Sequence, residues 1–325
     1  MDLLNVESFW INKKNRSYIK TEQIDPPKNN EVLIQTIYTG ISFGTEYIVY
    51  SGKVPKSEKN MMKCPHQVGN FGEEIKYGYL NVGKVIKGSP KYKGKNVFTL
   101  YPHQNLFTIA ENEISIIPRE IPLKRCLLTA NLETAINALW DTLPSVGDKC
   151  VIIGAGIVGL LMAYILKSII GLDVILIDKD KKKKKIADFF NISFFTTFNK
   201  NIRANYIYEC TGDSKLFKEI GRISENEATI CILSWYGTSQ STIKFGEYYL
   251  SKRLNIIFSQ VSKISKNRIK FWTNKTRRDL AIRLLNDKKL DALIDKNEIK
   301  FKKLPDFFKN IKNKNFFCKV VNYNK

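Results

Sequence analysis

The sequence predicts an α/β protein with two domains, a small β-rich domain followed by a parallel sheet covered by helices. Short apolar runs punctuated by Gly, Pro and Asn occupy residues 1–120 and indicate strands joined by turns. From about residue 121 to 285, strand-like and helix-like runs alternate, which is typical of a parallel sheet with crossover helices. The chain of 325 residues is long enough for two domains, each with its own core.

The first domain is predicted over residues 1–120. Its apolar runs are short and are bounded by turn-forming residues, as strands are in small β-rich domains. Four of these runs predict strands, at 31–39, 80–86, 96–100 and 106–109.

The second domain is predicted over residues 121–285. It opens with an apolar-periodic helix at 125–140, and a turn at 144–148 leads into its first strand. The signals that follow predict strands at 151–153, 174–177, 206–209, 228–234 and 254–260, and helices at 160–170, 182–190 and 214–223. Beyond this alternation, the sequence predicts a basic helix at 276–285 and a last strand at 316–321.

Residues 149–178 contain the pattern that restricts function most. An apolar strand runs into Gly154, Gly156 and Gly159, an apolar helix follows, and a second apolar strand ends on Asp178. The first glycine permits a tight turn, the second lets the backbone approach a pyrophosphate, and the third lets helix and strand pack closely. A carboxylate at the end of the second strand can accept hydrogen bonds from a ribose. This order of parts predicts a dinucleotide site.

The predicted contacts with the dinucleotide follow three strands, because ligands bind beyond the carboxyl ends of parallel strands. They are Gly154, Ala155, Gly156, Ile157, Val158, Gly159, Asp178, Thr211 and Gly212. Asp178 favours NAD, since a carboxylate there repels the 2′-phosphate of NADP. The lysine run at 179–185 leaves NADP open, although a charge run that opens a helix is usually a solvated face.

The net charge of +22 arises from lysines spread along the whole chain. They form neither one basic helix nor an aromatic-interleaved motif, so we expect no nucleic-acid partner and only long-range attraction of anionic molecules. No apolar run reaches membrane-spanning length, and the first residues lack the order of a secretory signal. The six scattered cysteines include no CxxC pair, which favours free thiols. We therefore expect a cytoplasmic protein with no membrane partner.

Several segments occur in an order that is similar to one known superfamily. They are Gly-Ile-Ser-Phe-Gly-Thr-Glu at 40–46, Tyr-Gly-Tyr-Leu-Asn-Val-Gly-Lys-Val at 77–85, Gly-Lys-Asn-Val at 94–97, Ala-Asn-Leu-Glu-Thr-Ala at 130–135 and Glu-Cys-Thr-Gly at 209–212. Together they resemble the medium-chain dehydrogenase/reductase superfamily of zinc-type alcohol dehydrogenase-like proteins over nearly the whole chain. Within it, 42–46 and 50–55 resemble the branch of the bacteriochlorophyllide dehydrogenases.

The resemblance implies a fold and an activity. The fold would be a GroES-like β-barrel over 1–120, completed by 286–325, with a Rossmann domain over 121–285 and the nicotinamide in the cleft between them. The activity would be hydride transfer between NAD or NADP and a small-molecule alcohol or carbonyl substrate. A homodimer through the edge of the Rossmann sheet is implied as well.

The chain departs from the family pattern where zinc would bind. Ser42, or Phe43 with a different gap, replaces the loop cysteine, Tyr79 replaces the histidine, and Asn131 stands about where a later cysteine would be. Zinc in proteins is held by thiolate, imidazole and carboxylate groups, and the four-cysteine lobe of structural zinc is missing too. An alternative ligand set is Cys64, His66 and Glu46. Hydroxyl and amide groups at the usual positions argue against any such site, so we expect no zinc.

Without zinc, another group must handle the proton and steady the substrate oxygen. Thr45 aligns with a loop hydroxyl that relays protons in the family, or it caps the loop. Tyr79 could donate from its phenol to a carbonyl oxygen, or its ring fills the vacated metal site. His103 could act as a general acid or base, or it lies on the surface of a Pro-containing turn. Glu133 is expected on a solvated helix surface.

Two other functions stay open. Reduction of a quinone or enone double bond is one, because relatives with that activity also lack zinc. A non-catalytic dinucleotide-binding or RNA-binding protein on the same fold is the other, and the +22 charge together with the missing zinc ligands motivates it.

Overall fold

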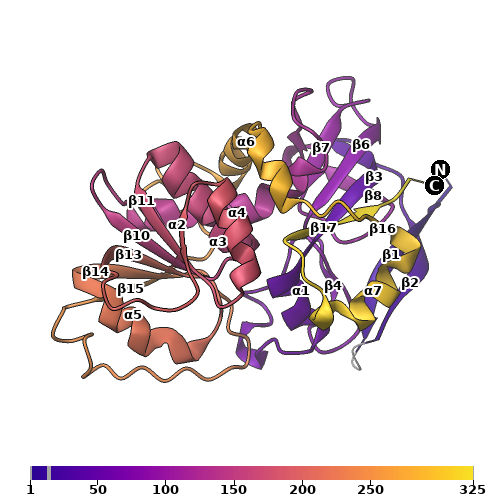
Figure 1. The fold of residues 1–325 in the computed structure, drawn as a ribbon. Helices are drawn as coiled ribbons and strands as arrows, with labels where there is room; N and C mark the ends of the chain where they lie inside the picture. Colours follow the sequence, from indigo (N-terminus) through magenta and orange to yellow (C-terminus); the bar gives the residue numbers. More distant parts are fainter. Residues whose placement is uncertain (1, 13–15, 325) are drawn as a thin grey trace. The chain divides into compact units, whose positions relative to one another are not determined.

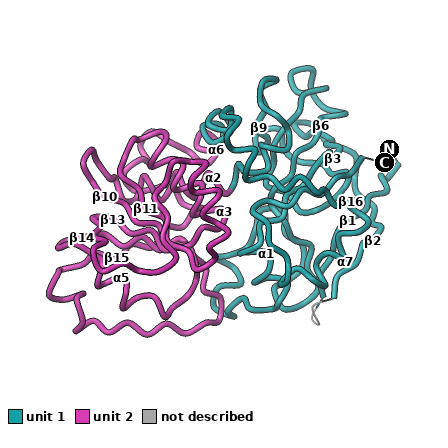
Figure 2. The backbone as a smooth tube through the Cα atoms, viewed as in Figure 1, with its two compact units in different colours: residues 1–130, 278–325 teal, residues 131–277 magenta. Residues whose placement is uncertain are grey.

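The computed structural model describes residues 2–12 and 16–324. The chain divides into two compact units, coloured separately in Figure 2: unit 1 comprises residues 1–130 and 278–325, and unit 2 comprises residues 131–277. The chain thus leaves unit 1 and returns to it. The divisions fall inside two helices, α2 (Thr129–Thr142) and α6 (Asn274–Leu284).

Unit 2 contains a six-stranded sheet in the order β12-β11-β10-β13-β14-β15, and all of its neighbouring strands run parallel (Figure 1). The strands are β10 (Lys149–Ile153), β11 (Asp173–Ile177), β12 (Ser193–Phe195), β13 (Ala204–Glu209), β14 (Ser224–Ile232) and β15 (Asn255–Phe258). In chain order this arrangement is 3-2-1-4-5-6, the Rossmann order, which reverses direction between β10 and β13. The predicted parallel α/β sheet is therefore confirmed.

Helices cover this sheet because their apolar side chains pack against the apolar side chains of the strands. α3 packs against β10, α4 against β12 and α5 against β14. The helical segments of unit 2 are α3 (Ile157–Tyr164) with a π-helical continuation (Ile165–Ile170), α4 (Lys184–Phe189) after a 3-10 turn (Lys181–Lys183), and α5 (Phe217–Ile223) after a 3-10 turn (Ser214–Leu216). The buried side chains of β10, β13 and β14 share one cluster with those of α5, including Val151, Ile207, Ile220 and Ile230.

Unit 1 contains two mainly antiparallel sheets. One has the order β2-β1-β5-β4, and the other has the order β16-β17-β3-β6-β7-β9 with β8 also paired to β3. The strands are β1 (Leu4–Asn12), β2 (Arg16–Ile24), β3 (Glu31–Ser42), β4 (Val68–Gly69), β5 (Ile75–Lys76), β6 (Asn81–Lys87), β7 (Asn96–Thr99), β8 (Leu106–Ala110), β9 (Ser115–Ile116), β16 (Ile299–Lys300) and β17 (Cys318–Asn322). Among the residues that the structure describes, these pairings do not close into a ring.

The C-terminal segment is built into unit 1. β17 pairs antiparallel with β3, and Arg125 binds Asp291 through two hydrogen bonds of 2.8 Å. The helical segments of unit 1 are α1 (Phe43–Tyr50), α7 (Leu304–Lys309) and 3-10 turns at Lys56–Glu58, Glu111–Glu113, Arg125–Leu128, Lys288–Leu293, Phe301–Lys303 and Ile311–Asn313. None of the described helices is both long enough and apolar enough to cross a membrane.

Candidate functional site

The turn after β10 has the geometry that its first glycine permits. Gly154 has a φ of +102°, in the region that favours glycine. A Cβ atom at this position would lie 2.8 Å from Thr211 Cγ2 and 2.9 Å from the carbonyl oxygen of Cys210. The turns that follow β10 and β13 are therefore in close contact, and Gly154 is the residue that allows this contact.

The other two glycines have different surroundings. A Cβ atom at Gly159 would lie 1.9 Å from the carbonyl oxygen of Gly154, so α3 can pack on the turn only with glycine there. A Cβ atom at Gly156 would meet nothing within 4 Å. Gly156 directly precedes α3, whose first backbone N–H groups are free of helical partners and favour an anion. The residues present thus fit a dinucleotide pyrophosphate.

Asp178 at the end of β11 is tied to the same turn. Its carboxylate accepts a hydrogen bond of 2.7 Å from the Ala155 N–H and one of 2.8 Å from the Asp180 N–H. Lys183 is half-buried, whereas the lysines on either side of it are exposed. Burial lowers the pKa of Lys183, and the charges of Asp178 and Asp180 oppose that effect. In the sequence, Lys183 could not be distinguished from the other lysines of the run, because all of its close neighbours are lysines as well.

Glu209 shapes the turn that contains Thr211 and Gly212. This fully buried carboxylate ends β13 and accepts hydrogen bonds from the Thr211 N–H at 2.6 Å, the Gly212 N–H at 3.1 Å and the Tyr236 hydroxyl at 2.7 Å. The same carboxylate also accepts from the Thr211 hydroxyl. Glu209 was not predicted to have a role, although an acid at the end of an apolar strand was the signal available.

Unit 1 gathers hydroxyl groups at the end of β3. Tyr79, which lies between β5 and β6, is hydrogen-bonded through its hydroxyl to Ser42 and Thr45. Burial, and after it the charge of Glu46, raises the pKa of Tyr79, so its hydroxyl stays protonated at neutral pH. Two of the three residues predicted to handle the proton, Thr45 and Tyr79, are thus brought together.

The third, His103, is buried rather than on the surface, with 1% of its area exposed. Its Nε2 lies 3.0 Å from Glu46 Oε2, and its Nδ1 lies 2.7 Å from Thr39 Oγ1. Glu46, 2% exposed, also accepts a hydrogen bond of 2.9 Å from the Ser42 N–H. Gly78 leaves the space for the ring, because a Cβ atom there would lie 2.9 Å from His103 Cδ2.

The donor groups of unit 1 do not fit zinc. At the family positions the side chains are the hydroxyls of Ser42 and Tyr79, which are hydrogen-bonded to each other. His66 does not join Cys64 and Glu46, because its Nε2 contacts Glu113 at 2.8 Å and its ring stacks on Tyr101. Over residues 2–12 and 16–324, no three His, Cys, Asp or Glu side chains are grouped to hold a metal ion.

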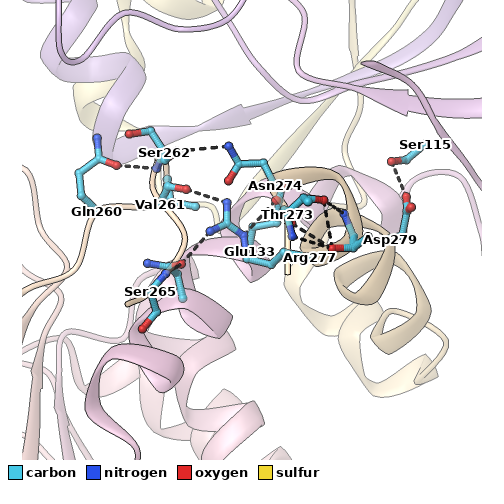
Figure 3. Close-up of polar contacts among 12 residues, drawn as sticks. Ser115, Glu133, Gln260, Val261, Ser262, Ser265, Thr273, Asn274, Arg277 and Asp279 are labelled. Atoms are coloured by element: carbon cyan, nitrogen blue, oxygen red, sulfur yellow. Dashed lines mark hydrogen bonds and ion pairs between the residues drawn. The ribbon is translucent and has the colours of Figure 1, made fainter. Parts of the chain in front are cut away.

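Glu133 is buried, so the expectation of a solvated helix surface is wrong. Figure 3 shows its ion pair with Arg277, whose Nε lies 3.2 Å from Glu133 Oε1. Arg277 also donates to the Asn137 amide oxygen at 2.7 Å and to the Val261 carbonyl oxygen at 2.6 Å. A buried carboxylate needs such a partner, and here the arginine supplied from the start of α6 provides it.

Comparison with known proteins gives distant relatives. No family model matches the chain. The chain is 24% identical over 286 residues to a class-3 alcohol dehydrogenase of Oryza sativa, covering 68% of this chain and 71% of that protein. It is 21% identical over 224 residues to a 2-dehydro-3-deoxy-L-galactonate 5-dehydrogenase of Pseudoalteromonas atlantica, covering 62% of this chain and 64% of that protein.

Solved structures share the fold along the chain. L-idonate 5-dehydrogenase of Escherichia coli has a TM-score of 0.80 at 12% identity and covers 99% of both chains. The alcohol dehydrogenase RspB of E. coli, complexed with NADH, has a TM-score of 0.77 at 15% identity and covers 98% of this chain and 99% of its own. TarJ of S. aureus with NADPH has a TM-score of 0.75 at 16% identity, covering 99% of this chain and 100% of its own.

Proposed function

We propose that the chain is a member of the medium-chain dehydrogenase/reductase superfamily and an NAD(P)-dependent oxidoreductase. The reaction would transfer a hydride between the nicotinamide and an alcohol or carbonyl carbon, without a catalytic zinc. The observation that carries this proposal is the turn of Gly154, Gly156 and Gly159 with Asp178 bound to it.

In this proposal unit 2 binds the dinucleotide. The first N–H groups of α3 would bind the pyrophosphate, with Gly156 leaving the approach open, and Asp178 would accept from the adenosine ribose. Thr211 and Gly212, positioned by Glu209, would line the rest of the site. The half-buried Lys183, whose pKa responds to the charge of Asp178, supports use of NADP as well as NAD, in line with the NADH and NADPH bound to the neighbouring structures. When bound, the nicotinamide supplies the hydride chemistry.

Unit 1 would bind the substrate as a GroES-like domain. Thr45, Tyr79 and His103 would handle the proton and the oxygen in place of a metal, because hydroxyl donors can stabilise charge that develops on a carbonyl oxygen. The donor set that does not fit zinc supports this part of the proposal. The names of the relatives suggest polyols, sugar acids and their keto forms as the first substrates to assay.

We also propose a homodimer formed through β15, the edge strand of the unit 2 sheet. An unpaired strand edge presents N–H and C=O groups that a second copy can pair with. Sedimentation of the purified protein tests this proposal, and a monomer at every concentration would contradict it.

Binding of the reduced cofactors tests the proposed function. We expect NADH to bind and the variant Asp178→Ala to weaken it by about tenfold or more, which is the loss of a charge-assisted hydrogen bond. Asp173→Ala is the matched control, because Asp173 is exposed at the other end of the same strand. Fluorescence titration measures both affinities. A protein that binds neither NADH nor NADPH would overturn the proposal.

A further inference from the structure

The groups proposed to handle the proton differ in how far a small molecule can reach them. Tyr79 and Thr45 are each half-buried, so part of each side chain faces solvent. His103 and Glu46 are buried, with 1% and 2% of their areas exposed. Of these four residues, Tyr79 and Thr45 are thus the more exposed pair and the candidates for contact with a substrate oxygen, whereas His103 and Glu46 are enclosed by the protein.

Both ring nitrogens of His103 already have partners inside the protein. Glu46 faces Nε2 and Thr39 faces Nδ1, at 3.0 and 2.7 Å. The Thr39 hydroxyl lies 3.3 Å from the Tyr323 hydroxyl, so the chain of contacts continues into the last residues of unit 1. In the Nε2–H tautomer of His103, Nε2 donates to the Glu46 carboxylate and Nδ1 accepts from the Thr39 hydroxyl. That arrangement gives both ring nitrogens a partner inside the protein, so His103 would exchange a proton with the substrate only through its neighbours.

Glu46 acts on several groups around it. The titratable side chains that face it, apart from His103, are Cys64, Tyr77, Tyr79, Cys318 and Tyr323. Burial raises the pKa of each of them, to about 12 for Cys64, and the charge of Glu46 raises it further. Burial and this carboxylate thus both favour the protonated form of these hydroxyls and thiols, and a protonated hydroxyl is a hydrogen-bond donor.

We propose that the Tyr79 hydroxyl is the group that donates to the substrate oxygen, and that Glu46 is a positioning residue that acts through His103 and the loop of Ser42 and Thr45. Glu46 holds His103 in the Nε2–H tautomer and holds the Ser42 backbone, to whose side chain the Tyr79 hydroxyl is hydrogen-bonded. This inference rests on the proposed function, because the roles of Tyr79 and Glu46 are roles in the proposed hydride-transfer site.

The imidazole signals of the whole protein test the role of Glu46 without cofactor or substrate. The chain has two histidines, so ¹⁵N-histidine labelling gives two ring systems, and His66 serves as the internal reference. We expect His103 to show only the Nε2–H tautomer at neutral pH. Glu46→Gln should keep it, because the amide oxygen also accepts from Nε2, whereas Glu46→Ala should give a mixture of tautomers with His66 unchanged.

Two results would overturn the role of Glu46. One is an Nδ1–H tautomer in the wild type, and the other is a His103 signal that Glu46→Ala leaves unaltered. Should Glu46→Ala fail to fold, Thr39→Val replaces it. Loss of the Thr39 hydroxyl should then move the Nδ1 signal of His103 toward that of an imidazole nitrogen that accepts no hydrogen bond. An unmoved Nδ1 signal in Thr39→Val would contradict the proposed arrangement.

Kinetics test the role of Tyr79. Tyr79→Phe should lower kcat by about 100-fold with little change in KM, as expected for one donor to a developing oxyanion. Tyr77→Phe is the matched control and should stay within about twofold of wild type, because Tyr77 is buried two residues away and hydrogen-bonded to Cys64. A fully active Tyr79→Phe overturns the assignment and leaves the proposed function intact. Cofactor binding without turnover by wild type on the panel of polyols and keto acids overturns the proposed function, and the histidine signals then decide the role of Glu46 alone.

Discussion

The glycine turn of unit 2 and the hydroxyl cluster of unit 1 are built in different ways. The glycine turn is local: one strand, one turn and one helix supply it, and the acid that binds it is 23 residues away. The hydroxyl cluster is assembled from distant segments, since His103 meets Glu46 and Thr39 at separations of 57 and 64 residues, and Thr39 meets Tyr323 at 284.

This difference teaches which changes each region tolerates. In the glycine turn the backbone atoms make the close contacts, so the absence of a side chain matters most. In the hydroxyl cluster the side chains make the contacts, and each one depends on the others for its partners. Replacing a glycine by a larger residue should therefore destabilise the glycine turn of unit 2 most. Loss of a single polar side chain should disrupt the hydroxyl cluster of unit 1 most.

The largest effect is expected for Gly159→Ala. The added methyl would lie 1.9 Å from a backbone oxygen, so we expect a loss of about 3 kcal/mol in the free energy of unfolding and loss of cofactor binding. Gly156→Ala is the matched control, because its methyl has open space. It should cost less than about 1 kcal/mol and yet weaken NADH binding. Urea unfolding measures the stabilities, and NADH titration measures cofactor binding. Equal stabilities of the two variants would show that the close contact at Gly159 does not cause the loss.

A smaller effect is expected for Gly78→Ala in unit 1. The methyl would press on the His103 ring, and the φ of +131° is strained for alanine, so we expect a cost of about 2 kcal/mol and a shifted His103 signal. Gly94→Ala has a φ of +79° and no atom within 4 Å, so it should show the backbone strain without the shift. NADH affinity should stay unchanged in both variants. An unshifted His103 signal in Gly78→Ala would rule out the close contact.

Lys183→Ala should change cofactor preference. We expect NADPH affinity to fall by about tenfold, because the ammonium near Asp178 would pair with the 2′-phosphate, while NADH affinity falls less. Lys181→Ala is the control, since Lys181 is exposed in the same run. Titration of both variants with both cofactors measures the ratio. If Lys183→Ala and Lys181→Ala have the same ratio of NADPH to NADH affinity, Lys183 does not contact the 2′-phosphate.

The smallest effect is a dependence of stability on pH in unit 1. Burial alone would raise the pKa of Glu22, but the hydrogen bond from Ser8 and the charge of Lys76 lower it below the ordinary 4.5. A lowered pKa contributes stability above about pH 4.5, and this stability is lost as the pH falls through the folded value. Hydrogen exchange at pH 6 and pH 3 should show β1 and β2 opening first in acid. In Glu22→Gln, hydrogen exchange of β1 and β2 should differ less between pH 6 and pH 3. If the difference is as large as in wild type, Glu22 is not its cause.

Much of the fold could be predicted from residues close together in the chain. The apolar runs at 31–39, 80–86 and 106–109 lie in β3, β6 and β8, and the alternation after residue 121 gives the parallel sheet. These signals are local because a strand or a helix buries one face of its own sequence. The hairpin of β1 and β2 and the short strand β12 were not predicted, since their residues lack long apolar runs.

The polar core could not be predicted in the same way. Glu133 and Arg277 carry no sign in the sequence that they pair, and each alone is typical of a surface. The same holds for Glu46 with His103. A charged side chain is buried only where a partner compensates its loss of hydration, and that partner comes from another element.

By itself, the sequence determined the alternation of strands and helices after residue 121 and the glycine turn, because backbone conformation and helix–strand packing are set by neighbouring residues. Only the tertiary structure decided that His103 is buried against Glu46, that Lys183 is half-buried within an exposed lysine run, and that Tyr79 is hydrogen-bonded to Ser42 and Thr45. Electrostatic and hydrogen-bond partners act through space, and the distance between two side chains is a property of the fold rather than of their separation in the chain.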